Sequence, residues 1–268
     1  FGEDLWIELA QQEKKADLIA GNNVYAHVPD ITDFTRGLKA CLKLGGTVTL
    51  EFPHLMRLLE HSQFDTVYHE HFSYLSLYTV SNIFKDAGLR IFDVEEITTH
   101  GGSIRVYGCH IDDQRVTTVD VDNLLSEESS RGLKLLETYT SFQPRADKIK
   151  NDLITFLLEK KVAGKTVVAY GAAAKGNTLL NYGGIKPDLL PVVYDAAKAK
   201  QDMFMPGSHI KILSPDKIKD SKPDYILILP WNIAEEVCEQ NSELRENGSK
   251  FVIAVPELKI LWTHTQEL

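Results

Sequence analysis

The order of apolar and polar positions predicts alternating strands and helices in the first part of the chain. A short buried-strand pattern over residues 16–20 is followed by a helix from Pro29 to Lys43, which Gly45 and Gly46 are expected to end, and by a second strand over residues 47–52. Strand, helix and strand with short joints are typical of a parallel sheet. Three more elements are predicted before residue 113, namely a helix over 77–87 and half-exposed strands over 90–97 and 103–110. Between these strands lies His100-Gly101-Gly102, as a hairpin joint or bulge would.

The pattern changes after residue 112. An amphipathic helical stripe runs through Ile149, Leu153 and Leu157, and Pro144 is expected to separate this helix from an earlier one. Four buried strands follow, over residues 166–170, 190–194, 225–229 and 251–255. Apolar strands with helices between them indicate a doubly wound parallel sheet. The pattern therefore predicts an α/β protein with two domains, residues 1–112 and 113–268, the second of which begins with a helical linker.

Composition narrows the class of protein. Hydrophobic residues make up 43% and charged residues 25% of the 268 residues, which is the balance of a globular protein. The net charge of −9 disfavours a general binder of nucleic acid or anionic membranes, and no apolar run reaches the ~18 residues of a membrane helix. Three scattered cysteines form neither a disulfide framework nor a zinc ligand set, which favours a cytoplasmic protein.

The densest group of polar side chains is Tyr68-His69-Glu70-His71. A neutral imidazole can abstract a proton, a neighbouring carboxylate can orient it, and a phenol can donate to a developing oxyanion. If the segment is helical, Tyr68 and His71 share a face. The alternative is a structural cluster or an ordinary surface turn.

A metal site is a second functional interpretation of the same histidines. His69 and His71 lack the i, i+4 spacing of a zinc-protease helix. His27 or His54 could complete a ligand set, but no spacing fixes one. We therefore predict no metal site in this chain.

A glycine-rich turn from Gly171 to Gly176 follows a predicted strand and opens a helix, the usual context of a phosphate-binding turn. Asp195 ends the next strand, where the acid that binds a ribose would lie in a dinucleotide site. Ala173, however, replaces the second glycine of that fingerprint, and its methyl group would crowd a pyrophosphate. Lys175 adds a positive charge at the helix N-terminus. The alternative is a tight turn whose small residues serve packing.

Asn22 and Asn23 form a weaker signal. They follow the carboxyl end of the first strand, and His27 comes shortly after them. Ligands of open α/β sheets bind at this edge, although a helix-capping turn would use the same residues.

Several stretches together resemble the S-adenosylmethionine-dependent sugar C-methyltransferases that act on deoxysugar nucleotides. The matching stretches run in order over nearly the whole chain: Gly21-Asn22-Asn23-Val24-Tyr25-Ala26-His27-Val28-Pro29-Asp30, Glu51-Phe52-Pro53-His54, Phe64-Asp65-Thr66-Val67-Tyr68-His69-Glu70-His71-Phe72-Ser73-Tyr74, His100-Gly101-Gly102-Ser103-Ile104-Arg105 and Tyr170-Gly171-Ala172-Ala173-Ala174-Lys175-Gly176-Asn177.

The resemblance implies a fold of three parts: a zinc-binding N-terminal domain, a Rossmann-type methyltransferase domain and a C-terminal α/β domain. We expect this chain to be N-terminally truncated, with the C-terminal half of the methyltransferase domain, from its fourth strand onward, followed by a second doubly wound Rossmann-like domain. Zinc would then belong only to the missing N-terminal domain. The cofactor implied by the resemblance is S-adenosylmethionine, whose glycine-rich loop would lie before Phe1.

The resemblance also implies roles for single residues. A keto-sugar nucleotide is deprotonated beside its ketone, and the enolate takes the methyl group. The base falls on His71, with Tyr68, Glu70 and His27 in support, and Asn22 and Asn23 lie where the family holds the methyl donor. The remaining residues are expected to bind the nucleotide sugar: Gly171, Lys175, Gly176, Asn177, Asp195, His100 and Arg105.

Two other functions remain open on the sequence. A nicotinamide-dependent oxidoreductase would use Gly171, Gly176 and Asp195, and a non-catalytic remnant would only bind a nucleotide sugar. The sequence leaves the sugar, the methylated carbon, the nucleotide and the oligomeric state open.

Overall fold

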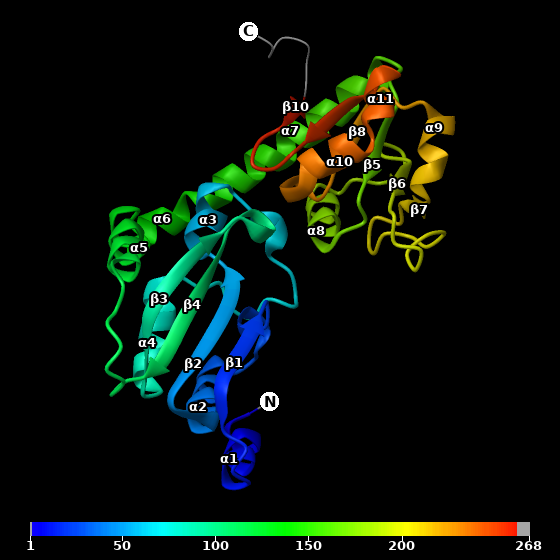
Figure 1. Ribbon diagram of the computed structural model, residues 1–268. Helices are drawn as coiled ribbons and strands as arrows, with labels where there is room; N and C mark the ends of the chain where they lie inside the picture. The colour runs from blue at the N-terminus through cyan, green and yellow to red at the C-terminus, as the bar shows by residue number, and fades with distance from the viewer. Residues whose placement is uncertain (1, 262–268) are drawn as a thin grey trace. The chain divides into compact units, whose positions relative to one another are not determined.

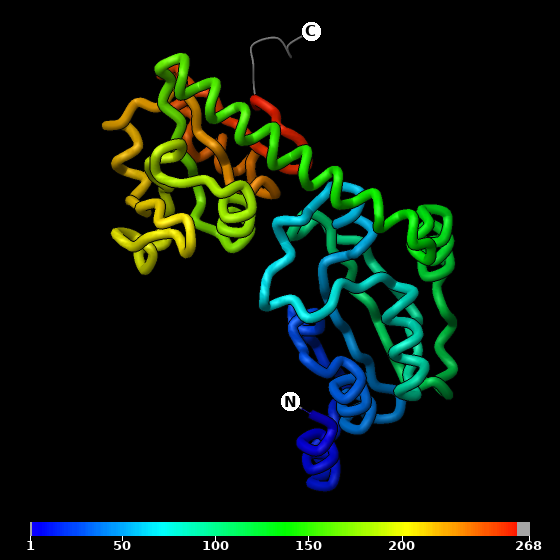
Figure 2. Tube along the Cα trace, turned by 180° about the vertical axis from the view of Figure 1, so that it is seen from behind, coloured from blue at the N-terminus to red at the C-terminus, as the bar shows by residue number. Residues whose placement is uncertain are grey.

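The structure is a computed structural model that describes residues 2–261, and the chain divides into two compact units (Figure 1). The first unit contains the residues up to Glu60 together with His69–Thr140. The second unit contains His61–Tyr68 and the residues from Ser141 onward. Figure 2 shows the same trace from behind. Each unit has its own hydrophobic core, so each is described by itself.

The first unit is built on a four-stranded mixed sheet in the order β1-β2-β4-β3. Its strands are β1 (Ala16–Asn22), β2 (Leu42–Pro53), β3 (Leu89–Ile97) and β4 (Ser103–His110). β1 and β2 are parallel, whereas β4 is antiparallel to both β2 and β3. The predicted parallel pair and the predicted hairpin are therefore confirmed.

Helices cover the apolar face of this sheet. The first unit has the helices α1 (Glu3–Gln11), α2 (Ile31–Cys41), α3 (Leu55–Glu60), α4 (Leu77–Asp86), α5 (Val119–Ser130) and α6 (Leu136–Thr140). Side chains of α2, α4 and α5 pack against β2 and β4 in one core, around the fully buried Tyr25, Phe52 and Phe84. Asp30 caps α2 by accepting from the backbone N–H groups of Thr32 and Asp33.

The expected end of α2 is wrong. The helix ends at Cys41, and the strand begins at Leu42 and runs through Gly45 and Gly46. Leu42 pairs with Ala16 of β1, and this pairing draws the residues before the glycines into the sheet. Strand pairing of this kind is a tertiary effect, and the local helical pattern of the sequence does not predict it.

Residues 113–140 lie with the first unit. Val121, Leu124 and Leu133 are buried in its core, so the helices α5 and α6 are not part of the second compact unit. The compact units change at Ser141. The domain boundary after residue 112 stays a prediction.

The second unit contains a six-stranded sheet in the order β10-β9-β8-β5-β6-β7. Its strands are β5 (Val167–Tyr170), β6 (Val192–Tyr194), β7 (Lys211–Leu213), β8 (Tyr225–Ile228), β9 (Lys250–Ile253) and β10 (Lys259–Leu261). All neighbours are parallel except β9 and β10. The predicted doubly wound sheet is confirmed. Two edge strands of three residues, β7 and β10, escaped prediction because, unlike the equally short β6, each begins with an exposed lysine and carries no run of buried apolar residues.

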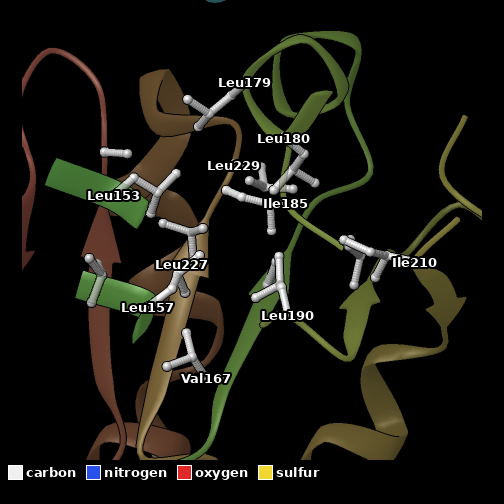
Figure 3. Packing of buried hydrophobic residues seen from close by; sticks show 14 of the residues in the cluster. Leu153, Leu157, Val167, Leu179, Leu180, Ile185, Leu190, Ile210, Leu227 and Leu229 are labelled. Atoms are coloured by element: carbon white, nitrogen blue, oxygen red, sulfur yellow. The ribbon is translucent and has the colours of Figure 1, made fainter. Parts of the chain in front are cut away.

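Within the described residues, the α-helices of this unit are α7 (Phe142–Val162), α8 (Ala174–Tyr182), α9 (Ile218–Ser221), α10 (Ala234–Gln240) and α11 (Ser242–Glu246). Leu153 and Leu157 of α7 pack against the sheet beside Leu227 (Figure 3). The predicted apolar stripe of this helix is thus buried. Pro144 does not precede the helix as expected but lies in its first turn, where the missing N–H needs no intrahelical acceptor.

The order of the second sheet creates a switch point at β5 and β8. From β5 the chain continues to β6 and β7 on one side, and it then returns to β8, β9 and β10 on the other. The connections that follow two such neighbouring strands lead to opposite sides of the sheet. A crevice then forms at the carboxyl ends of the strands, and open α/β sheets bind ligands there. In this unit that edge is formed by the residues after Tyr170 and after Ile228.

In neither unit does any helix among residues 2–261 have the length and apolarity needed to cross a bilayer.

Candidate functional site

His71 lies against His27 in the first unit. Their ring centroids are 4.8 Å apart at an interplanar angle of 75°, and the ring of Tyr74 lies 5.9 Å from that of His71. The backbone fixes this arrangement, because the N–H groups of Phe72 and Ser73 both donate to the carbonyl of Ala26, at 2.9 and 3.2 Å. Two of the predicted catalytic residues are therefore neighbours, and both are half-buried.

The Tyr68–His71 block is a turn and not a helix. The expectation that Tyr68 and His71 share a helical face therefore does not apply. The division between the two compact units falls inside the block, since Tyr68 belongs to the second unit and His69 begins the next part of the first. Glu70 is exposed.

Asn23 meets His100 at the carboxyl end of β1. The amide nitrogen of Asn23 lies 3.3 Å from Nε2 of His100, and the Asn23 backbone N–H donates to the carbonyl of Glu51 at 2.8 Å. Asn23 and His100 both have left-handed backbones, with φ of 54° and 56°. Such conformations are uncommon outside glycine, although asparagine tolerates them best. Asn22 precedes this pair with an exposed side chain, so polar groups line the edge where ligands of α/β sheets bind.

Arg105 and Glu51 form a cross-strand pair on the other face of the first sheet. Their strands place them in register, and the guanidinium donates to a Glu51 carboxylate oxygen at 2.9 Å and to Glu95 at 3.3 Å. Thr99 donates to the second Glu51 oxygen at 3.3 Å. Glu51 is only 6% exposed, so this acid is a buried part of the site that the sequence analysis had not identified. An acidic residue inside an apolar strand was the available signal.

The glycines of the turn after β5 are required by packing. A Cβ on Gly171 would lie 2.4 Å from the Pro230 ring, and one on Gly176 would lie 2.6 Å from the Cβ of Leu229. Gly171 also has φ of 89°, a conformation that glycine adopts at little cost. The close strand–helix packing expected of the alternative interpretation is therefore present, and it brings the N-terminus of α8 beside the end of β8.

Asp195 closes this turn from the end of β6. One carboxylate oxygen accepts from the backbone N–H of Ala172 at 2.6 Å, and the other accepts from the N–H of Ala197 at 2.7 Å. Lys200 lies 3.4 Å from the first oxygen. Because each oxygen accepts from a backbone N–H, Asp195 fixes the shape of the turn.

Lys175 is a buried cation at the N-terminus of α8. Its side chain is 8% exposed, and within residues 2–261 its ammonium nitrogen has no hydrogen-bond partner. The nitrogen lies 4.6 Å from the ring centroid of Trp231. Burial lowers the pKa of Lys175, and the charge of Asp65 acts in the opposite direction. Asn177, two residues on, buries a side-chain oxygen that likewise finds no donor in the described part of the chain.

Asp65 completes a cluster that the sequence analysis had not identified. Its side chain is fully buried, and one oxygen accepts from the indole N–H of Trp231 at 2.7 Å. Burial raises the pKa of Asp65 to about 6, while the Trp231 hydrogen bond and the charge of Lys175 act against this rise. We call Asp65, Lys175 and Trp231 the switch-point cluster, since Lys175 and Trp231 follow β5 and β8.

The raised pKa of Asp65 predicts a pH-dependent stability. Between its ordinary value of 3.8 and about 6 the folded protein retains a proton that the unfolded chain has released, so stability falls as the pH rises through this window. Asp65→Asn should remove this loss. Relative to the variant, the wild-type protein should lose roughly 2–3 kcal/mol of unfolding free energy between pH 4 and pH 7. Urea unfolding of the wild-type protein and of Asp65→Asn at the two pH values tests this. An equal change in unfolding free energy between the two pH values in both proteins would contradict it.

Each unit has a cavity among the described residues. A pocket of about 540 Å³ beside Trp231 is lined by Asn232, Glu236 and Lys259 among others. Asn232 buries a side-chain oxygen that has no donor among residues 2–261. A more open depression of about 1260 Å³ in the first unit is lined by Lys39, His110 and other residues at the opposite end of its sheet from Asn23. No group of three or more metal-binding side chains occurs in the described residues.

Comparison with known proteins finds matches over nearly the whole length of this chain. Residues 3–94 match the family model of a methyltransferase domain, and residues 98–256 match that of the C-methyltransferase C-terminal domain. The chain is 35% identical over 261 residues to the C-methyltransferase NovU of Streptomyces niveus, covering 97% of this chain and 62% of NovU. The chain thus spans less than two thirds of that relative.

Solved structures are more distant. A SAM-dependent methyltransferase from Aquifex aeolicus is 18% identical, with a TM-score of 0.26 over 35% of this chain and 46% of that one. An O-methyltransferase family protein from Burkholderia thailandensis is 13% identical, with a TM-score of 0.29 over 40% of this chain and 35% of the other. Scores this low add no argument, so the assignment rests on the family models. One of them covers more than half of the chain, which therefore belongs to the C-methyltransferase family.

Proposed function

We propose that the protein carrying this chain is an S-adenosylmethionine-dependent C-methyltransferase that acts on a keto-deoxysugar nucleotide. The observation that carries the proposal is the packing of His71 against His27 near the ligand-binding edge of the first sheet, in a chain of this family. The relative NovU is named a C-methyltransferase.

In the proposed reaction, His71 acts as the general base. Its neutral imidazole takes a proton from the carbon beside the ketone, and the electron pair of that C–H bond becomes an enolate. Donors such as the Tyr68 phenol stabilise the oxyanion, and Glu70 and His27 support the imidazolium. The enolate carbon would take the methyl group that bound S-adenosylmethionine supplies, and the electrons of the broken carbon–sulfur bond would remain on the sulfur.

Asn22 and Asn23 are the proposed residues toward the methyl donor. S-adenosylmethionine supplies an electrophilic methyl group on a sulfonium. The exposed Asn22 amide and the left-handed Asn23 turn lie at the carboxyl end of β1, and amides can bind the polar parts of such a molecule. His100 is held beside them through Asn23, and with Arg105 it is proposed to contact the sugar.

The second unit is proposed to bind the nucleotide diphosphate. The first-turn N–H groups of α8, on Ala174, Lys175 and Gly176, have no backbone acceptor within residues 2–261, and the buried Lys175 ammonium lies at the same helix end. A diphosphate would supply the missing acceptors. Asn177 has an orphan oxygen that fits a ligand hydroxyl, while Gly171 and Asp195 hold the turn in shape.

Lys175→Met should weaken binding of a nucleoside diphosphate about tenfold or more, because a charge-assisted hydrogen bond to a buried ammonium is lost. Calorimetric titration of the chain with the diphosphate measures this. Lys148→Met is the matched control, since Lys148 is an exposed lysine of α7 whose side chain is 74% accessible. An equal affinity of the two variants would place the diphosphate elsewhere.

The same titration with NAD tests the oxidoreductase alternative. That function needs an acid that a ribose can reach, and Asp195 is only 8% exposed, with each oxygen accepting from a backbone N–H group. We therefore expect the diphosphate to bind more tightly than NAD. Preference for NAD would overturn the proposed function, and binding without any methyl transfer in the full-length gene product would favour a non-catalytic remnant.

A further inference from the structure

We propose that Asp65 is a positioning residue of the anion site: through Trp231 it holds the ammonium of Lys175 at the switch point of the second sheet. This inference rests on the diphosphate site proposed above and adds to it a third chain segment. The site would then be built from residues 61–68 as well as from the turns after β5 and β8.

Trp231 links Asp65 to Lys175. The carboxylate accepts from the Trp231 indole at 2.7 Å, and the ring of Trp231 in turn carries the Lys175 ammonium at 4.6 Å from its centroid. An ammonium at this distance from an indole is attracted to the ring face. The hydrogen bond to Asp65 fixes how the ring is turned about its side-chain bonds. It therefore fixes the surface on which the ammonium rests.

Asp65 itself is held rigidly. It lies in a 3-10 turn, Phe64–Thr66, whose residues are all buried. The ring of Phe64 packs 5.2 Å from that of Tyr182 in α8, the helix whose first turn carries Lys175. The turn is thus anchored to the helix that carries the cation, and Asp65 has little freedom to follow a displaced tryptophan.

The switch-point cluster contains buried polar atoms without hydrogen-bond partners, which favours a role in ligand binding beyond a role in stability. A buried polar atom without a partner costs about 1–3 kcal/mol, and native proteins contain few of them. Here the Lys175 nitrogen and the second Asp65 oxygen both lack hydrogen-bond partners within residues 2–261. A ligand oxygen would satisfy the ammonium. Asp65 would keep that ammonium in place without neutralising it by direct contact.

Two substitutions separate position from charge. Asp65→Asn keeps an oxygen that can accept from the Trp231 indole but removes the charge, whereas Asp65→Ala removes both. We expect inorganic pyrophosphate, titrated into the chain by calorimetry, to bind Asp65→Asn within about threefold of wild type and Asp65→Ala about tenfold more weakly. In the full-length enzyme Asp65→Ala should raise KM for the sugar nucleotide by a similar factor and leave kcat within about threefold.

Tryptophan emission provides a readout that is independent of the ligand. The signal of Trp231 is obtained by subtracting the spectrum of Trp231→Phe. Without ligand, this signal should shift in Asp65→Ala, which lacks the acceptor, and stay unchanged in Asp65→Asn.

The outcomes distinguish this inference from the proposed function. Equal pyrophosphate affinity of wild type and Asp65→Ala would show that Asp65 positions nothing, while the anion site would stand. Equal weakening in both variants would assign the effect to charge and overturn positioning through the hydrogen bond. If pyrophosphate does not bind the wild-type chain at all, the anion site itself is wrong, and the role of Asp65 falls with it.

Discussion

His71→Asn should lower the turnover of the full-length enzyme by a factor of about 10²–10⁴, the usual contribution of a general base. Asparagine has a similar size and can still form hydrogen bonds, but it cannot take a proton near neutral pH. His71 packs against His27 and Tyr74, and asparagine would leave the backbone contacts of Phe72 and Ser73 intact. The loss should therefore appear in kcat, with the affinity for the nucleotide nearly unchanged.

His69→Asn is the matched control for this experiment. His69 lies two residues away in the same turn, but its side chain is exposed. We expect its turnover to stay within about threefold of wild type, as for other surface substitutions away from the chemistry. If His69→Asn and His71→Asn lose activity equally, the block acts through its structure and His71 is not the base.

Glu128→Ala should be strongly destabilising. Glu128 of α5 is 1% exposed and accepts three hydrogen bonds: from Nε2 of His54 at 2.7 Å and from the backbone N–H groups of Leu77 and Tyr78 at 2.6 and 2.9 Å. The last two donors are the first residues of α4, so the carboxylate occupies a helix N-terminus that would otherwise be unsatisfied. Removal leaves the buried donors of His54 and Leu77 and the part-buried N–H of Tyr78 without this acceptor, and we expect a loss of about 3–5 kcal/mol in unfolding free energy.

Glu127→Ala is the neighbouring control. The Glu127 side chain is 34% accessible and forms longer ion pairs, 3.7 Å to Arg57 and 3.5 Å to Arg131. Exposed pairs contribute little, so this variant should lose no more than about 1 kcal/mol. Urea unfolding followed by far-ultraviolet circular dichroism compares the two variants. A loss in Glu128→Ala as small as that in Glu127→Ala would mean that the buried acid does not join α4 and α5.

Much of the fold could be predicted because its signals are local. The apolar strands of the second unit alternate with helices, and such a pattern has few solutions besides a doubly wound sheet. The pairing of β1 with β2 and the β3–β4 hairpin followed from the same reasoning. The end of α2 did not, since it depends on Leu42 pairing with a strand that lies 26 residues earlier.

The candidate site was predictable only where its residues share a motif. His71 and His27 could be predicted because each lies in a stretch of sequence that resembles a known family. Asp65 and Trp231 are 166 residues apart and meet only through the fold, and Glu128 lies in a polar helix with no pattern around it. A buried acid of this kind is visible in a sequence only when its distant partner is already known.

The most direct test of the proposed mechanism is hydrogen exchange at the substrate carbon beside the ketone, followed by proton NMR in deuterated solvent with the full-length enzyme. If His71 is the base, the wild-type protein exchanges this proton, and His71→Asn slows the exchange by the same factor of about 10²–10⁴ by which it slows turnover. Exchange at the wild-type rate in His71→Asn, while methyl transfer is lost, would show that another group removes the proton and would contradict the proposed mechanism.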